Sequence, residues 1–205
     1  MRVLLLFAAF VVSSYAHGKK IPATIISNGK SRNVTFVVKV GLLGGEPNFI
    51  NLQHKIKYFD EAGKKQMLRP EDVDEVIFDY EGMHVRMISC VNNLEGGLST
   101  SRKILLKLEM DGPLRLYRYY YNQSNPGMSG PGGTSTAGST YRMENLIFQK
   151  RNGPLKRPKG LGWRKDMREY FSDCPDLATL IENKDLRRKE VEAVVTYYNQ
   201  HCAGK

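Results

Sequence analysis

The sequence predicts an α+β fold, in which an antiparallel β-meander is followed by a small C-terminal helical tail. In the first two thirds of the chain, apolar and polar residues alternate in many short segments, which is the period of half-buried strands. Turn dipeptides separate these segments, and connections this short permit only antiparallel pairing. From residue 162 the apolar spacing becomes helical. We therefore expect a β domain over residues 17–160 and a helical tail over residues 161–205.

The strand pattern is clearest in residues 33–40, with the sequence NVTFVVKV. Alternation puts four apolar side chains on one face, namely Val34, Phe36, Val38 and Val40. Asn28-Gly29 precedes this segment and suits the positive φ angles of a tight hairpin turn. Similar turns are predicted at Glu61-Ala62-Gly63, Glu81-Gly82 and Asp111-Gly112. Together these segments predict eight or nine strands.

One segment, residues 122–140, is rich in Gly, Ser, Thr and Pro and has almost no apolar side chains. It lacks the surface whose burial would offset the entropy of ordering it. We therefore expect a mobile loop at the tip of a hairpin formed by residues 115–121 and 141–148. The alternative is a flexible binding loop.

Three short helices are predicted in the tail. Their apolar residues fall in three sets: Trp163, Met167, Tyr170 and Phe171; Leu177, Leu180 and Ile181; Val191, Val194, Val195 and Tyr198. Pro175 suits the first turn of the second helix, with Asp173 as a cap. A break is expected at residues 183–185.

The chain has three cysteines, so at least one is unpaired within a monomer. Cys174 and Cys202 are predicted to form a structural disulfide, because a hairpin of the last two helices would bring them together. A metal site would need more ligands than nearby His201, and a redox pair would more often show Cys-x-x-Cys spacing. Cys90 is expected to be a buried or partly buried free thiol.

Residues 1–16 have the pattern of a secretory signal peptide: Met1-Arg2, an apolar run over residues 3–12, and small residues before Ala16. The run is shorter than the ~20 residues that span a bilayer, so no transmembrane anchor is predicted. The protein is expected to be exported, and to be periplasmic, outer-membrane-associated or secreted.

The formal net charge is +10, which favours anionic partners. Eight cationic residues fall within residues 150–168, a range that we call the basic segment: Lys150, Arg151, Lys156, Arg157, Lys159, Arg164, Lys165 and Arg168. This segment is either a solvated connector or a surface for acidic polysaccharide or lipopolysaccharide, and export argues against nucleic acid. Three tyrosines of one strand face could stack on sugars or pack between strands: Tyr117, Tyr119 and Tyr121.

No catalytic, metal-binding or cofactor motif is predicted. Residues 127–131, GMSGP, fall short of the Gly-x-Ser-x-Gly elbow because Pro131 replaces the last glycine. Asp72 and Asp74 alternate as in calcium loops, but the other loop ligands are missing, which favours a solvated turn.

Several stretches resemble a group of exported proteins of unknown function from bacteria of the Bacteroidetes group. The resemblance covers most of the chain after the signal, and its most specific parts are Asp173-Cys174-Pro175 and the ending Tyr198-Asn199 … Cys202. It implies export and the order of strands before helices, and it implies no activity.

The favoured function is a non-enzymatic structural or interaction role of an exported or envelope protein, with another envelope protein as partner. The first alternative is a binding module for anionic glycan or envelope lipid that uses the basic segment. The second alternative is a hydrolase whose site is assembled from residues distant in sequence.

Overall fold

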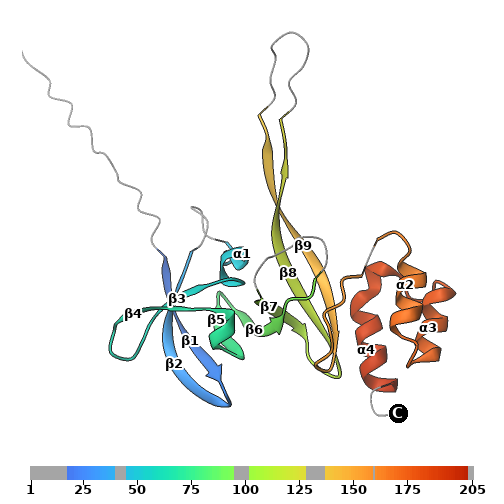
Figure 1. Ribbon diagram of the computed structural model, residues 1–205, viewed down its shortest axis with the longest axis horizontal. Helices are drawn as coiled ribbons and strands as arrows, with labels where there is room; N and C mark the ends of the chain where they lie inside the picture. The colour runs from blue at the N-terminus through green and yellow to red at the C-terminus, as the bar shows by residue number, and fades with distance from the viewer. Residues whose placement is uncertain (1–17, 40–44, 95–101, 128–136, 159, 203–205) are drawn as a thin grey trace, which may run out of the picture.

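The computed structural model describes residues 18–39, 45–94, 102–127, 137–158 and 160–202. Within them, nine strands form one antiparallel sheet that is followed by a helical tail, which confirms the predicted α+β class (Figure 1). The strands are β1 (Lys19–Ser27), β2 (Lys30–Val38), β3 (Ile56–Phe59), β4 (Lys65–Leu68), β5 (Glu75–Tyr80), β6 (Met83–Val91), β7 (Lys103–Met110), β8 (Leu114–Asn125) and β9 (Ser139–Lys150). The predicted signal peptide, residues 1–16, lies outside the described residues.

The sheet departs from a continuous meander at one place. Its strand order is β4-β3-β2-β1-β5-β6-β7-β8-β9, so β5 pairs with β1 rather than with β4. The chain returns from β4 through the 3₁₀ turn η1 (Pro70–Asp72). The Asp74 carboxylate then accepts a hydrogen bond of 2.6 Å from the backbone N–H of Asn28, and the Asp74 N–H donates to Ile26 at 2.9 Å. These two bonds align the start of β5 with the end of β1.

The predicted hairpin turns are confirmed. Asn28 and Gly29 have φ angles of 51° and 71° between β1 and β2, and Glu81 and Gly82 have 49° and 82° between β5 and β6. Positive φ at both central residues matches the twist of paired strands. In β2, Val34, Phe36 and Val38 are buried as predicted; Val40 lies outside the described residues.

The predicted loop over residues 122–140 is too long. Strands β8 and β9 stay paired out to Asn125 opposite Ser139, and form an arm that projects from the sheet (Figure 1). Polar side chains do not prevent strand pairing here, since the backbones bond to each other and the side chains face solvent. The Ser124 and Thr140 hydroxyls even approach across the pair at 3.2 Å. The predicted mobile tip falls on residues 128–136, which lie outside the described part of the chain.

A short helix that the sequence analysis did not predict, α1 (Phe49–Leu52), packs against β8. At its end, the buried amide of Gln53 donates to the Tyr120 carbonyl at 2.8 Å and accepts from the Tyr120 N–H at 2.7 Å. The Gln53 carbonyl accepts from the Leu105 N–H of β7 at 3.0 Å. Direct pairing of β7 with β8 covers only Lys107 to Met110 of β7, so Gln53 joins the two strands where they have separated.

The tail contains the three predicted helices, α2 (Trp163–Tyr170), α3 (Pro175–Glu182) and α4 (Val191–His201), with the 3₁₀ turn η2 (Arg188–Glu190) before α4. They lie at the β8–β9 end of the sheet, away from β1–β4 (Figure 1). Their apolar faces bury Met167, Phe171, Leu177 and Val194 with Phe148 of β9. No helix in the described ranges is both long and apolar enough to cross a membrane.

Candidate functional site

The structure does not gather all eight cations of the basic segment on one surface. Lys150, at the end of β9, turns its ammonium inward to the carboxylate of Asp173 at 2.5 Å and to the carbonyl of Tyr170. The same ammonium lies 4.6 Å from the ring centre of Tyr170 and 5.1 Å from those of Phe171 and Tyr198. Lys150 therefore connects the helical tail to the sheet, and its predicted place in an anion-binding surface is wrong.

Lys156 also forms an ion pair within the protein, since its ammonium lies 2.5 Å from the carboxylate of Asp166 in α2. Arg151 and Arg157 are exposed, and Lys159 lies outside the described residues. Among the described members of the basic segment, three line the same hollow, namely Arg164, Lys165 and Arg168 of α2.

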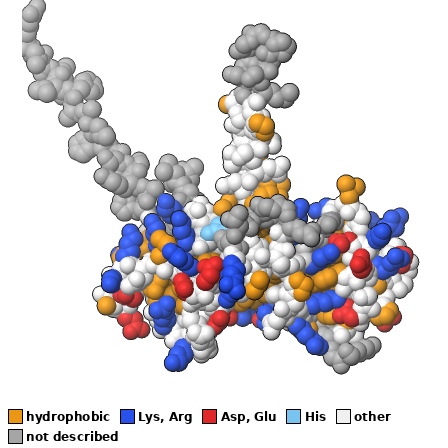
Figure 2. Space-filling model, viewed as in Figure 1, with side chains coloured by type: hydrophobic (Ala, Val, Ile, Leu, Met, Phe, Trp, Pro, Cys, Tyr) orange, Lys and Arg blue, Asp and Glu red, His pale blue; other side chains and the backbone are white. Residues whose placement is uncertain are grey.

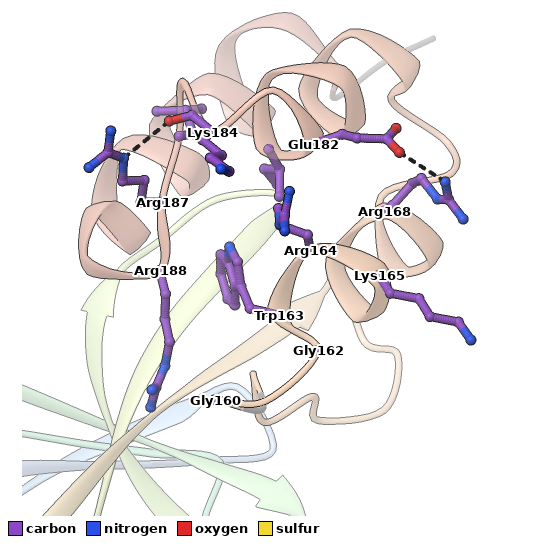
Figure 3. A pocket seen from close by; sticks show the side chains of 12 residues that line it. Gly160, Gly162, Trp163, Arg164, Lys165, Arg168, Glu182, Lys184, Arg187 and Arg188 are labelled. Atoms are coloured by element: carbon purple, nitrogen blue, oxygen red, sulfur yellow. Dashed lines mark hydrogen bonds and ion pairs between the residues drawn. The ribbon is translucent and has the colours of Figure 1, made fainter.

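The hollow has a volume of about 590 Å³ and lies between α2, the end of α3 and the connection to η2 (Figure 3). Three further cations line it: Lys184, Arg187 and Arg188. We call this hollow the basic pocket. These three cations were not predicted from the sequence, because they follow α3 and lie outside the basic segment. The run Arg187-Arg188-Lys189 after the predicted helix end was the available signal.

Local backbone structure positions the second group of cations. Helix α3 ends at Glu182, and Lys184 takes a left-handed conformation with φ 71°. The Asp185 N–H then reaches back to the Leu180 carbonyl at 2.9 Å, which closes the helix end. The Arg187 guanidinium donates to the Lys184 carbonyl at 3.3 Å, so the turn holds two of the cations close to each other.

The charge of the pocket is almost entirely positive. Its one carboxylate, Glu182, is paired with Arg168 at 3.1 Å. The other five cations have no ion pair with any described residue: Arg164, Lys165, Lys184, Arg187 and Arg188. Figure 3 shows Trp163 between Arg164 and Arg188, whereas Lys165 points away. Figure 2 shows Lys and Arg side chains at both ends of the molecule. The pocket differs from the other cationic parts of the surface because its cations line a hollow.

Trp163 lines the pocket, and its indole N–H is buried beneath the pocket surface. Its side chain is buried, with 7% of the residue exposed, and its indole N–H is buried without a hydrogen-bond partner in the described structure. An unmet buried donor costs about 1–3 kcal/mol. An acceptor oxygen that reaches this N–H would remove that cost.

Two of the three tyrosines on the predicted face are not available for stacking on sugars, and the third, Tyr121, is half-buried with its ring stacked on Tyr119. Tyr117 and Tyr119 are buried, and the Tyr117 hydroxyl donates to Gln149 at 2.9 Å. Burial raises the pKa of Tyr117, so it stays neutral. These rings belong to the core between β8 and its neighbours, which was the packing interpretation of the sequence.

Cys174 and Cys202 lie at disulfide distance, with their Cα atoms 5.6 Å apart, as predicted. Cys174 precedes α3 and Cys202 follows α4, so the bond joins the outer ends of these helices. Cys90 is a buried free thiol, also as predicted, and burial raises its pKa to about 11. It is therefore protonated at neutral pH and a poor nucleophile.

Asp173 does not cap α3 as the sequence suggested, because Cys174 occupies the N-cap position. The Asp173 carboxylate instead accepts hydrogen bonds from Lys150 and, at 2.6 Å, from the Tyr198 hydroxyl. Partial burial alone would raise the pKa of Asp173. The hydrogen bonds from Lys150 and Tyr198 lower it by more than burial raises it, so the pKa lies below its usual value.

This shift predicts an acid-sensitive attachment of the tail. A carboxyl with a depressed folded pKa adds stability above its unfolded pKa of about 3.9, and loses it as pH falls through the folded value. We expect Asp173→Asn to be less stable than wild type at pH 7, with a difference in melting temperature that shrinks as pH falls below about 3.9. Melting curves from pH 2.5 to 7 test this. The control Asp72→Asn changes an exposed carboxyl without an ion pair to any described residue, and a pH trend equal to that of Asp173→Asn would contradict the assignment.

The described residues contain no group of three His, Cys, Asp or Glu side chains that could hold a metal ion. Comparison with models of protein families, with curated proteins and with solved structures finds no match for the chain. Fold and site thus define a class only: an antiparallel α+β protein with a basic pocket in its helical tail. The resemblance to exported proteins of Bacteroidetes stays a prediction.

Proposed function

We propose that the protein is an exported binding protein that holds an acidic polysaccharide in the basic pocket. The observation that carries this proposal is the charge of the pocket: six cations line it, and its one carboxylate is already paired. A concave surface lined by one sign of charge concentrates ligands of the opposite sign. A volume of about 590 Å³ lies within the range of small-ligand sites. Export rests on the signal pattern of residues 1–16.

The side chains of the pocket favour binding over hydrolysis. Its described lining contains no Ser, Thr, Cys, His or Tyr that could act as nucleophile or general base. Glu182 is the only carboxyl in that lining, and it is ion-paired with Arg168. The hydrolase alternative therefore has no support from this site.

A structural or interaction role is the second candidate, and the β8–β9 arm favours it. β9 is the last strand of the sheet, and among described residues its outer edge is paired only through the bridge of Phe148 with Lys156. The arm also exposes Tyr141 and Met143. An open strand edge can accept a strand from a partner protein.

The pocket is tested by charge reversal. Arg164→Glu combined with Lys184→Glu should weaken binding to polygalacturonate and dextran sulfate roughly 30-fold, from about 1 kcal/mol for each exposed contact. Wild-type affinity should fall as salt rises, because the contacts are exposed to screening. Calorimetry over a salt series measures both effects.

The matched control is Lys30→Glu with Lys65→Glu, which changes the net charge equally on exposed residues of β2 and β4. Equal losses in the two double variants would show that net charge, and not the pocket, causes binding. If neither polysaccharide binds while lipopolysaccharide or anionic lipid does, the ligand class is wrong. If nothing binds, the interaction role becomes the leading candidate.

A further inference from the structure

A second hollow adjoins the basic pocket. It has a volume of about 450 Å³ and lies between β9 and the start of α4. Its lining consists of Glu144, Asn145, Leu146, Pro158, Arg188, Lys189 and Val191. Arg188 also lines the basic pocket, so the two hollows meet at this residue.

The second hollow is also basic. Its cations are Arg188 and Lys189, and neither has an ion pair within the described residues. Its one carboxylate, Glu144, is paired with Arg118 of β8. Each hollow is therefore lined by cations without an ion pair to a described residue and by one carboxylate that is ion-paired with an arginine.

Each hollow is also lined by a residue whose donor has no described partner. Trp163 lines the basic pocket and Asn145 lines the second hollow, but the indole N–H and the side-chain amide nitrogen themselves are buried beneath the surface. Sugars supply acceptor oxygens on every residue, in their hydroxyl groups and ring. A chain that carries carboxylates along its length would meet the cations of both hollows at once.

The Arg188 guanidinium lies beside the backbone of Gly160. A Cβ atom at residue 160 would lie 2.9 Å from the Arg188 guanidinium nitrogen Nη1. Because glycine has no side chain, the guanidinium can lie against the backbone there. From this place it can contact a ligand in either hollow.

We infer that the two hollows form one extended site for an acidic polysaccharide chain, with Arg188 between neighbouring charged sugars; this rests on the proposed function of the basic pocket. A lone anionic group would use one hollow, whereas cations without an ion pair to any described residue line both. An anionic lipid is the alternative, because an apolar hollow with Leu180, Ala193 and Tyr197 shares Leu186 with the basic pocket.

Chain length tests the inference. Trp163 is the only tryptophan, so its fluorescence reports ligand in the basic pocket. In titrations with galacturonate oligomers from one to about eight residues, affinity should rise until the chain spans both hollows and then level off. Lys189→Glu should weaken the longest oligomer about 10-fold and leave the shortest unchanged, whereas Arg164→Glu should weaken both. Lys65→Glu is the control for net charge, and melting curves check that each variant folds.

The outcomes separate the two proposals. Binding by short and long oligomers with equal affinity, unaffected by Lys189→Glu, would overturn the extended site and leave the basic pocket as a small anion site. Binding of phosphatidylglycerol vesicles without binding of any oligomer would overturn both proposals in favour of a lipid. If neither the oligomers nor the vesicles bind, the extended site and the basic pocket as a polysaccharide site are both overturned.

Discussion

Replacement of Gln53 by alanine should lower the free energy of unfolding by about 3–5 kcal/mol, a large effect for a change outside the regular elements. The Gln53 amide makes both of its bonds to the backbone of Tyr120, at 2.7 and 2.8 Å, and the side chain is fully buried. Alanine would leave one buried N–H and one buried carbonyl without partners, and it would add a cavity. Urea unfolding followed by circular dichroism measures the change.

Gln53→Met separates the two contributions. Methionine keeps most of the volume and removes both hydrogen bonds, so it should still cost about 2–3 kcal/mol. If the methionine variant is as stable as wild type, packing and not hydrogen bonding holds α1 against β8. The control Gln66→Met changes a less buried glutamine of β4, whose amide donates to Asp60 at 3.1 Å, and should cost less than about 1 kcal/mol.

Gln53 also shows what the sequence could not predict. Hairpin turns such as Asn28-Gly29 depend on the φ preferences of two residues, and the tail helices depend on apolar spacing within about ten residues. Such local signals predicted the strands and helices. The amide of Gln53 meets a strand 67 residues away, and nothing in the sequence around it indicates that contact.

The candidate site likewise combines residues that the local sequence predicted with residues that it could not predict. The sequence marked Arg164, Lys165 and Arg168 because they stand in one basic segment. It gave Lys150 the same role, although its partner Asp173 is 23 residues away and turns it into a structural contact. It missed Lys184, Arg187 and Arg188, which join the pocket only because α3 folds back beside α2.

Replacement of Cys174 and Cys202 together by serine is the second large effect, and it should lower the free energy of unfolding by about 3–4 kcal/mol. The bond closes a loop with a sequence separation of 28 residues, and in the chain-entropy model a loop of this size restricts the unfolded chain by that amount. Thermal and urea unfolding measure the loss. Wild type unfolded in the presence of dithiothreitol should match the double variant.

The loss should be confined to stability and should leave the pocket intact. The bond holds the end of α4, where Asn199 accepts from the Leu114 N–H at 2.7 Å and donates to its carbonyl at 3.0 Å. The basic pocket lies at the opposite end of α3, around Glu182 and Lys184. Hydrogen exchange should therefore speed up first in residues 198–202, while polysaccharide affinity changes less than about threefold under conditions where the variant is folded. A large loss of affinity in the folded variant would instead mean that the disulfide sets the position of the pocket cations, through the core cluster that contains both cysteines together with Trp163 and Ile181 of the pocket.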